Sequence, residues 1–369
     1  MIHLRWNIFK QYLTPRRTYK LFIFLFCKKY TLLYAVIICF IIVSQVQSKN
    51  NKNWIKVAKS TEEQFECDKC FSLGFEIIMQ NRLICKPYQQ SNEVNTLILI
   101  FTVHSNFLAR KVIRETWLTP SYNNTGQVRH AFLLGTTNDE ILTSQVKQEH
   151  VNFGDIIQFS FYESYRNLTL KTLMGFKWAT EFCSNAHFII KTDDDVYVNI
   201  NGLLRAMLIH GSSLRTSVAG ICEIGSLRDT NPSSKWYVSP TEYPYRRYHG
   251  ICHGFGYITS IHTLHNILKV YVNIPYIHLE DVYIGFCVKR LGYKLVNIGG
   301  FFREEDIEYS PCNLKHPKSV LGHHVSLQQM KVIWNTPCDN GLTRKQLMFN
   351  IIMTVIPKFT VGQVLGVFV

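Results

Sequence analysis

Acidic residues are scarce in this chain of 369 residues, with 26 Asp and Glu against 40 Lys and Arg. The first 60 residues hold eleven Lys and Arg and no acid, so of the net charge of +14 only +3 remains for residues 61–369. A nucleic-acid-binding groove needs its positive charge on the folded part of the molecule. The charge distribution therefore argues against a nucleic-acid partner and marks the N-terminus as a separate region.

Charge is also missing from residues 30–46, "YTLLYAVIICFIIVSQV", an apolar run near the lower limit for a membrane-spanning helix. Seven Lys and Arg precede it, and by the positive-inside rule they keep the N-terminus in the cytosol. No clear small-residue cleavage site follows, which argues against the alternative of a cleaved signal peptide. We therefore predict a basic cytosolic tail (1–29), a signal-anchor (30–46) and a lumenal remainder.

Zinc-site spacing is incomplete, because Cys67-x-x-Cys70 has no second C-x-x-C or C-x-x-H pair to supply four ligands. We predict a disulfide between these two cysteines instead. Nine cysteines follow the apolar run, and an odd number predicts that one is free or pairs between chains. Many cysteines suit an oxidising compartment, and N-x-T sequons at Asn123 and Asn167 predict glycosylation in the same lumenal space.

No internal repeat is visible, and composition divides the lumenal part instead. Residues 47–92 are polar and rich in Lys, Gln and Asn, which predicts a stem. For residues 93–338 we predict a catalytic domain of the α/β class. Residues 339–369 form an apolar tail to which the sequence assigns no role.

Residues 95–195 alternate between apolar strands and helices, which predicts a Rossmann-like, mostly parallel sheet with helices on both faces. The expected strands are "TLILIFTVHS", "VRHAFLLG", "DIIQFSF" and "AHFIIKTDDD", and the helices lie in "ARKVIRETW", "NDEILTSQVKQEH" and "LTLKTLMGFKWATEFC". Ligands of such sheets bind outside the carboxyl ends of the strands.

Three consecutive acids, Asp193, Asp194 and Asp195, fall at one of those strand ends. Neighbouring carboxylates repel each other unless a cation neutralises them. Mg²⁺ and Mn²⁺ prefer oxygen ligands, so the cluster predicts a divalent cation that accompanies a diphosphate. The alternative is a solvated acidic turn.

The segment "IIKTDDDVYVN" resembles the metal-binding D-x-D segment of the β-1,3-galactosyltransferase family, which also contains β-1,3-N-acetylglucosaminyltransferases. Further segments similar to the family follow its order across residues 95–335. These segments are "RKVIRETW", "FLLG", "DIIQFSFYESYRNLTLKT", "KWYVSPTEYP", "GFGYITS", "EDVYIG" and "HHVSLQQMKVIW". The resemblance implies a type II Golgi membrane protein with a GT-A-type fold and a UDP-sugar donor.

The same resemblance assigns the metal and donor residues. It implies that Asp195 binds the metal, that His323 completes the metal site, and that Asp193 and Asp194 contact the ribose or sugar of the donor. Mixed oxygen and imidazole ligands favour Mn²⁺ over Mg²⁺. His324 is the alternative ligand, and because adjacent residues on a strand point in opposite directions, only one histidine is expected to serve.

Asp281 matches the catalytic base of the family, and Glu280 is expected to orient it or to bind the acceptor. Acids at the start of the predicted helix "LEDVYIGFCVKRLGY" are also ordinary capping residues. A helix N-terminus is expected to lower the pKa of a carboxylate, which weakens a base.

Two arginines and two aromatic residues complete the candidate site. Arg110 and Arg114, one helical turn apart, are expected to bind donor phosphates or, as the alternative, to hold the structure together. Trp236 and Tyr237 are expected to offer flat faces to the acceptor sugar, or to be buried. Trp117 is expected in the core.

The segment "YHGICHGFGY" (248–257) departs from the family pattern "YPPYCSGTGY" at several positions, which leaves the sugar specificity open. The sequence therefore predicts a Golgi, metal-dependent, inverting β-1,3-glycosyltransferase that moves galactose from UDP-galactose to an acceptor glycan on a glycoprotein or glycolipid. The alternatives are transfer of N-acetylglucosamine from UDP-GlcNAc and a catalytically silent lumenal binder or chaperone of the same fold.

Overall fold

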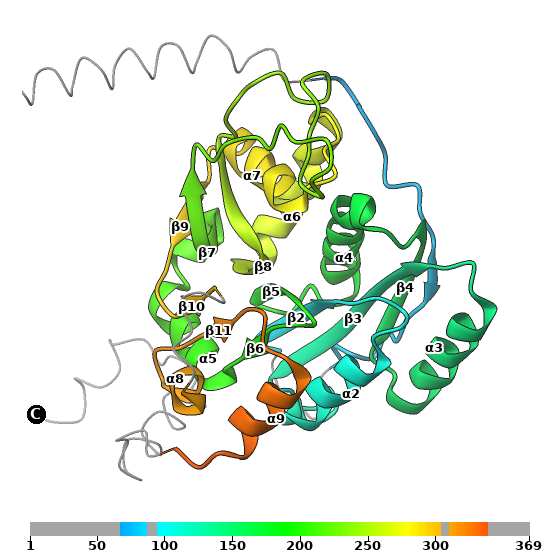
Figure 1. Ribbon diagram of the computed structural model, residues 1–369, viewed down its shortest axis with the longest axis vertical. Helices are drawn as coiled ribbons and strands as arrows, with labels where there is room; N and C mark the ends of the chain where they lie inside the picture. The colour runs from blue at the N-terminus through cyan, green and yellow to red at the C-terminus, as the bar shows by residue number, and fades with distance from the viewer. Residues whose placement is uncertain (1–66, 87–93, 304–309, 339–369) are drawn as a thin grey trace, which may run out of the picture. The chain divides into compact units, whose positions relative to one another are not determined.

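An eight-stranded sheet runs through the part of the chain that this computed structural model describes, residues 67–86, 94–303 and 310–338 (Figure 1). Its strand order is β1-β4-β3-β2-β5-β8-β7-β9. The strands are β1 (Ile77–Met79), β2 (Thr96–Phe101), β3 (Val128–Thr136), β4 (Ile156–Tyr162), β5 (Phe188–Asp193), β7 (Ser217–Ile224), β8 (Gly250–Ser260) and β9 (Lys294–Asn297).

The sheet is mostly parallel, as predicted, with one inserted antiparallel strand. The pairs β4-β3, β3-β2, β2-β5 and β7-β9 are parallel. Strand β8 lies between β5 and β7 and runs antiparallel to both. Every residue of β2 is buried, as expected for a central strand that is covered on both faces.

Helices cover both faces of this sheet, which confirms the predicted layers (Figure 1). Helices α4, α6 and α7 contact one another, whereas α9 contacts α2 and α8. The helices are α2 (Phe107–Glu115), α3 (Glu140–Phe153), α4 (Leu168–Phe182), α5 (Ile200–His210), α6 (Ile261–Val270), α7 (Glu280–Arg290), α8 (Pro311–Lys315) and α9 (Leu327–Asn335). Trp117 is 1% exposed within a core cluster that contains residues of α2, α5 and α9, as predicted.

Capping residues explain where several helices start and stop. The Asp139 side chain accepts a hydrogen bond from the Leu142 N–H at the start of α3, and α3 ends at Gly154 with φ of 64°. Ser326 and Gln329 form a reciprocal capping box at the start of α9. Of these two helices, α3 was predicted from the sequence.

A second, three-stranded sheet joins distant parts of the chain. It consists of β10 (Phe301–Phe302), β11 (Leu321–Gly322) and β6 (Tyr197–Val198). In the antiparallel pair, Leu321 lies opposite Val198 and Gly322 opposite Tyr197. Because β6 begins just after Asp195 and β11 ends just before His323, this pairing brings the two predicted metal ligands together.

The folded unit extends beyond the predicted boundary at residue 93. Within the predicted stem, β1 pairs with β4, and Ile77 lies opposite Phe159. The Phe71 ring contacts the rings of Tyr271, Tyr276 and Tyr283 edge-on. The polar composition of residues 47–92 gave no sign of this short strand, and residues 67–86 of the predicted stem pack against the sheet.

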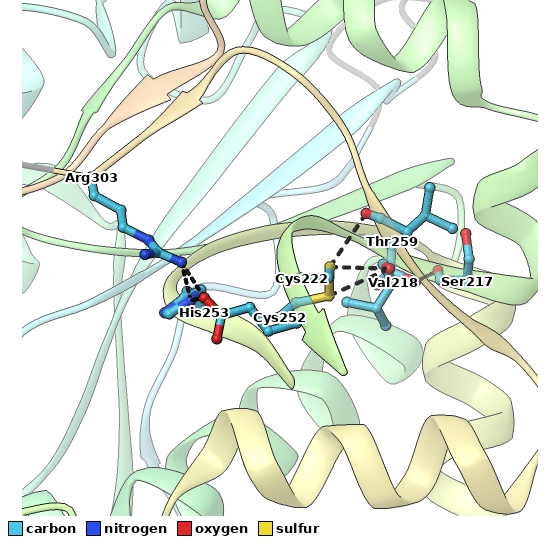
Figure 2. The surroundings of a disulfide bond; sticks show 9 residues. Ser217, Val218, Cys222, Cys252, His253, Thr259 and Arg303 are labelled. Atoms are coloured by element: carbon cyan, nitrogen blue, oxygen red, sulfur yellow. Dashed lines mark hydrogen bonds and ion pairs between the residues drawn. A yellow bond between two sulfur atoms is a disulfide. The ribbon is translucent and has the colours of Figure 1, made fainter. Parts of the chain in front are cut away.

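Four disulfides and one free, buried thiol, Cys287, account for the nine cysteines. The disulfides are Cys67–Cys70, Cys85–Cys183, Cys222–Cys252 and Cys312–Cys338. Both the predicted Cys67–Cys70 bond and the predicted odd cysteine are confirmed. Figure 2 shows Cys222–Cys252, which joins opposed residues of β7 and β8, with His253 and Arg303 nearby.

No helix in residues 67–86, 94–303 and 310–338 is long and apolar enough to cross a bilayer. The predicted tail, signal-anchor and C-terminal segment (1–29, 30–46 and 339–369) lie outside the described residues.

Candidate functional site

The acidic triplet follows β5, the central strand between β2 and β8. Asp193 is the last residue of β5 and pairs with Phe101 at the end of the parallel strand β2. The triplet therefore lies at the carboxyl ends of parallel strands, which is where α/β sheets bind ligands. Its placement at this edge was predicted from the sequence.

Asp193 is linked to the start of α7 by a lysine that sequence analysis missed. The Lys191 Nζ lies 2.6 Å from the Asp193 Oδ1 and 3.3 Å from the Glu280 Oε1. It also donates a hydrogen bond to the Gly254 carbonyl. Burial lowers the pKa of Lys191, but these two carboxylates raise it by more, so the net direction is upward. A charged residue inside the buried "FIIK" strand was the overlooked signal.

Glu280 is 4% exposed and is held from several sides. Its Oε2 accepts a hydrogen bond from the Tyr257 hydroxyl at 3.0 Å and lies 3.4 Å from the Thr172 hydroxyl. A Cβ atom at Gly254 would approach its Oε1 to 2.6 Å, so only glycine leaves room there. Burial raises the pKa of Glu280 to about 7, against the opposing effect of Lys191. The contacts suit a residue that orients its neighbours.

Asp281 is half-buried beside Glu280 in the first turn of α7. Its Oδ1 accepts a hydrogen bond from the Val282 N–H at 2.8 Å, but the N-cap residue of α7 is Leu279 and no side chain of the described residues caps the helix. Burial nevertheless raises the pKa of Asp281 above its ordinary value, although that hydrogen bond lowers it. The N–H at the helix start thus lowers this pKa, as expected, but burial has the larger effect and the net direction is upward.

Asp194 faces the start of α2. Its Oδ2 accepts hydrogen bonds from the Thr102 hydroxyl at 2.6 Å and from the Asn106 side-chain amide at 2.9 Å. Asn106 is the residue that precedes α2. The contacts fix this carboxylate at the point where β2 gives way to the helix, and neither partner was identified from the sequence.

Asp195 lies beside both candidate histidines. Its Oδ2 is 3.6 Å from the His323 Nε2 and 3.7 Å from the His324 Nε2. The expected opposite orientation of the two histidines was wrong, because His324 adopts a left-handed φ of 56° that breaks the strand alternation. Asp195 Oδ1 is buried without a hydrogen-bond partner in the described residues, which fits a carboxylate oxygen that serves a cation. The residues present therefore suit a divalent metal.

Arg110 and Arg114 contact carboxylates of the fold. Arg110 is fully buried and forms an ion pair with Glu149 at 2.7 Å. Arg114 also pairs with Glu149 at 2.7 Å and forms two hydrogen bonds with Asp155, at 2.7 and 2.8 Å. These contacts describe the structural alternative left open by the sequence. Arg110 still lies next to the acidic cluster. It donates to the Thr102 hydroxyl at 3.2 Å, and that hydroxyl donates to the Asp194 carboxylate.

Replacing Arg114 by Met is expected to lower the free energy of unfolding by roughly 1–3 kcal/mol. The buried carboxylates of Glu149 and Asp155 lose one charged partner, but each keeps another partner in the fold. In the folded fraction, the KM for the nucleotide-sugar donor is expected to stay close to the wild-type value, because the Arg114 guanidinium is already engaged by Glu149 and Asp155. Urea unfolding and donor titrations on one preparation check both. Arg215→Met, at an exposed position, is the control. A large rise in KM without loss of stability would restore the donor-binding role.

Trp236 and Tyr237 differ in their surroundings. Trp236 is 54% exposed, with the Lys235 Nζ 4.8 Å from the centre of its ring. Tyr237 is half-buried and forms an isolated bridge with Asp229. A second exposed ring was missed by the sequence analysis: Tyr165, whose pKa is raised to about 12 by burial and then by Asp281. Trp236 and Tyr165 therefore offer exposed aromatic surface near the α7 acids.

Comparison with known proteins identifies the family. The galactosyltransferase family model matches residues 108–298. Beta-1,3-galactosyltransferase 1 of Mus musculus and of Homo sapiens are each 38% identical over 256 residues, which cover 69% of this chain and 77% of the relative. Beta-1,3-galactosyltransferase 5 of Pan paniscus is 34% identical over 64% of this chain and 79% of its own.

A crystal structure of a galactosyltransferase in complex with donor and acceptor sugar analogues covers 66% of this chain and 98% of its own, with 11% identity and a TM-score of 0.35. A similarity this low supports no inference about the site. The family match and the curated relatives are sufficient by themselves: this chain belongs to the β-1,3-galactosyltransferase family and is a hexosyltransferase.

Proposed function

We propose that this protein transfers galactose from UDP-galactose to the 3-hydroxyl of an acceptor glycan, with inversion at the anomeric carbon and with a divalent metal. One observation carries the proposal: Lys191 bridges Asp193 of the acidic triplet and Glu280 at the start of α7. The carboxylate that we propose for the donor and the one beside the proposed base are thus linked by one lysine at the same edge of the sheet. The names of the relatives favour galactose over N-acetylglucosamine.

In the proposed mechanism, Asp281 accepts the proton of the acceptor hydroxyl as that oxygen attacks the anomeric carbon. Its raised pKa makes it a stronger base than an ordinary aspartate. Glu280 holds the neighbouring backbone and side chains in place through Tyr257 and Lys191. Trp236 and Tyr165 present aromatic faces on which a sugar ring can stack.

Asp193 and Asp194 are proposed to contact the ribose or sugar of the donor, and Asp195 and His323 to hold the metal. When bound, a divalent cation offsets the negative charge that develops on the departing nucleotide diphosphate. A cavity of about 420 Å³ that is lined by His323, His324 and residues of α8 and α9 lies beside these ligands. Mn²⁺ is the metal we propose, because imidazole accompanies carboxylate in the ligand set.

The activity is tested with detergent-solubilised full-length protein, a panel of UDP-sugars and a panel of acceptor glycosides. UDP-galactose is expected to give acceptor-dependent UDP release, and the product is expected to contain a β-1,3 linkage. Chelation should remove the activity, and Mn²⁺ should restore it. Transfer from UDP-GlcNAc alone would select the alternative donor, and UDP binding without transfer to any acceptor would favour a silent binder.

We also propose a single-pass type II orientation in the Golgi membrane, with residues 47–369 in the lumen. Asn123 is exposed at the surface, and Asn167 is half-buried at the start of α4. In cells, the chain should carry glycans that a glycosidase removes, and protease added outside sealed vesicles should leave the catalytic domain intact. Asn123→Gln and Asn167→Gln identify the modified residue. Cleavage of the domain in sealed vesicles would contradict the lumenal orientation.

A further inference from the structure

The rings of Phe255, His323 and His324 form a stack next to Asp195. The centres of the Phe255 and His323 rings are 4.4 Å apart and their planes differ by 10°. The centres of the two imidazoles are 3.8 Å apart, with an interplanar angle of 28°. The two histidines therefore lie side by side and face the same carboxylate.

Main-chain contacts hold this arrangement in place. The His323 N–H donates to the Phe302 carbonyl at 3.0 Å, and the Val325 N–H donates to the Asp195 carbonyl at 2.9 Å. The backbone is thus fixed on both sides of His324, whose φ of 56° is uncommon for a residue with a side chain. A strained conformation between two anchored neighbours indicates that the direction of this side chain is constrained.

The positions of the donor atoms match those around a single ion. Ligand atoms of Asp195, His323 and His324 all lie within 4.8 Å of one another. Metal–ligand bonds of about 2.1 Å place neighbouring ligand atoms roughly 3–3.5 Å apart, so a small contraction is sufficient. The buried Asp195 Oδ1 without a hydrogen-bond partner in the described residues is the second feature that points to a cation here.

We propose that His324 is a second imidazole ligand, so that one carboxylate and two imidazoles hold the cation, and that Phe255 is a positioning residue that supports His323. The inference rests on the proposed metal dependence. Phe255 is 7% exposed and lies on β8, which holds its ring against His323.

The ligand set determines which cations bind. Two imidazoles and one carboxylate favour borderline ions, and affinity should rise from Mn²⁺ to Co²⁺ in the usual order for divalent metals. Mg²⁺, which prefers oxygen ligands, should compete weakly. A site with a single imidazole would discriminate less between Mn²⁺ and Mg²⁺.

The first experiment counts nitrogen ligands without any substitution. Chelator-treated full-length protein is loaded with Mn²⁺ alone, and pulsed electron paramagnetic resonance measures the coupling to nitrogen nuclei. Two coupled imidazole nitrogens are expected. One nitrogen would overturn the proposal for His324 and leave the proposed function intact, whereas no specific Mn²⁺ binding would contradict the metal dependence itself.

The second experiment measures Co²⁺ affinity by visible absorbance and calorimetry. Loss of a residue that supports a metal ligand typically weakens metal binding by roughly 10–100-fold. His324→Ala removes a proposed ligand and is expected to weaken Co²⁺ binding by at least that much. Phe255→Leu removes only a supporting ring and is expected to weaken Co²⁺ binding by about tenfold. His265→Ala, at an exposed position of α6, is the control. Wild-type affinity in His324→Ala, together with lost binding in Asp195→Asn, would overturn the proposal.

Discussion

The Asp281→Asn variant is expected to turn over about 10²–10⁴-fold more slowly than the wild type, because proton transfer by a positioned group typically contributes that much. Asparagine keeps the size of the side chain and its hydrogen bond from the Val282 N–H, but it cannot accept the proton of the acceptor hydroxyl. Donor affinity should change little. The loss should therefore appear in kcat, measured at saturating UDP-galactose.

Helix capping is the competing role for Asp281, and a matched substitution separates the two. Asp139 caps α3 and lies on an exposed surface, so Asp139→Asn changes an acid at a helix start without touching the site. It should leave kcat unchanged. Wild-type activity should also fall on acidification, at a higher pH than an ordinary aspartate would give, because the pKa of this base is raised, and Asp281→Asn should lack that acidic decline. Near-normal kcat in Asp281→Asn would remove it from the mechanism.

The Lys191→Met variant is expected to lose about 3–5 kcal/mol of unfolding free energy, because it leaves buried charge without its partner. Asp193 and Glu280 share this ammonium, whose side chain is 2% exposed. Without Lys191, their carboxylates face each other and the Gly254 carbonyl loses its donor. We expect activity to fall as well, since Asp193 is proposed to contact the donor and Glu280 to hold the neighbourhood of the proposed base.

Urea unfolding of Lys191→Met and of Lys177→Met checks this prediction. Lys177 is an exposed lysine on α4, so its replacement should cost little. Should both variants unfold at the same urea concentration as the wild type, the bridge between Asp193 and Glu280 would contribute nothing to stability. Retained stability with lost activity would instead assign Lys191 to the chemistry alone.

Much of the fold was predictable because its signals are local. The four strands before the acidic triplet are short apolar runs, and one of the helices between them, α3, starts at a capping residue, Asp139. A parallel sheet follows from that alternation alone. The strand-end position of Asp193 follows in turn, since the carboxyl ends of parallel strands meet at one edge.

The rest depended on contacts between residues far apart in the chain. Strand direction is not encoded in an apolar run, so nothing in "GFGYITS" predicted that β8 runs antiparallel between β5 and β7. The bridge by Lys191 requires α7 and β5 to be placed first. The paired orientation of His323 and His324 depends on one backbone angle at His324, which the sequence does not predict because only a few per cent of residues other than glycine have positive φ.

The strand β1 and the Cys85–Cys183 bond have a practical consequence for any shortened form of the enzyme. A protein that starts at residue 93 would keep Cys183, which is fully buried in the disulfide, as a thiol without its partner. It would also uncover the free edge of β4, whose unpaired N–H and C=O groups can join a strand from another molecule. Such a truncation should yield cross-linked and fibrous material, and one that starts before Cys67 should stay monodisperse.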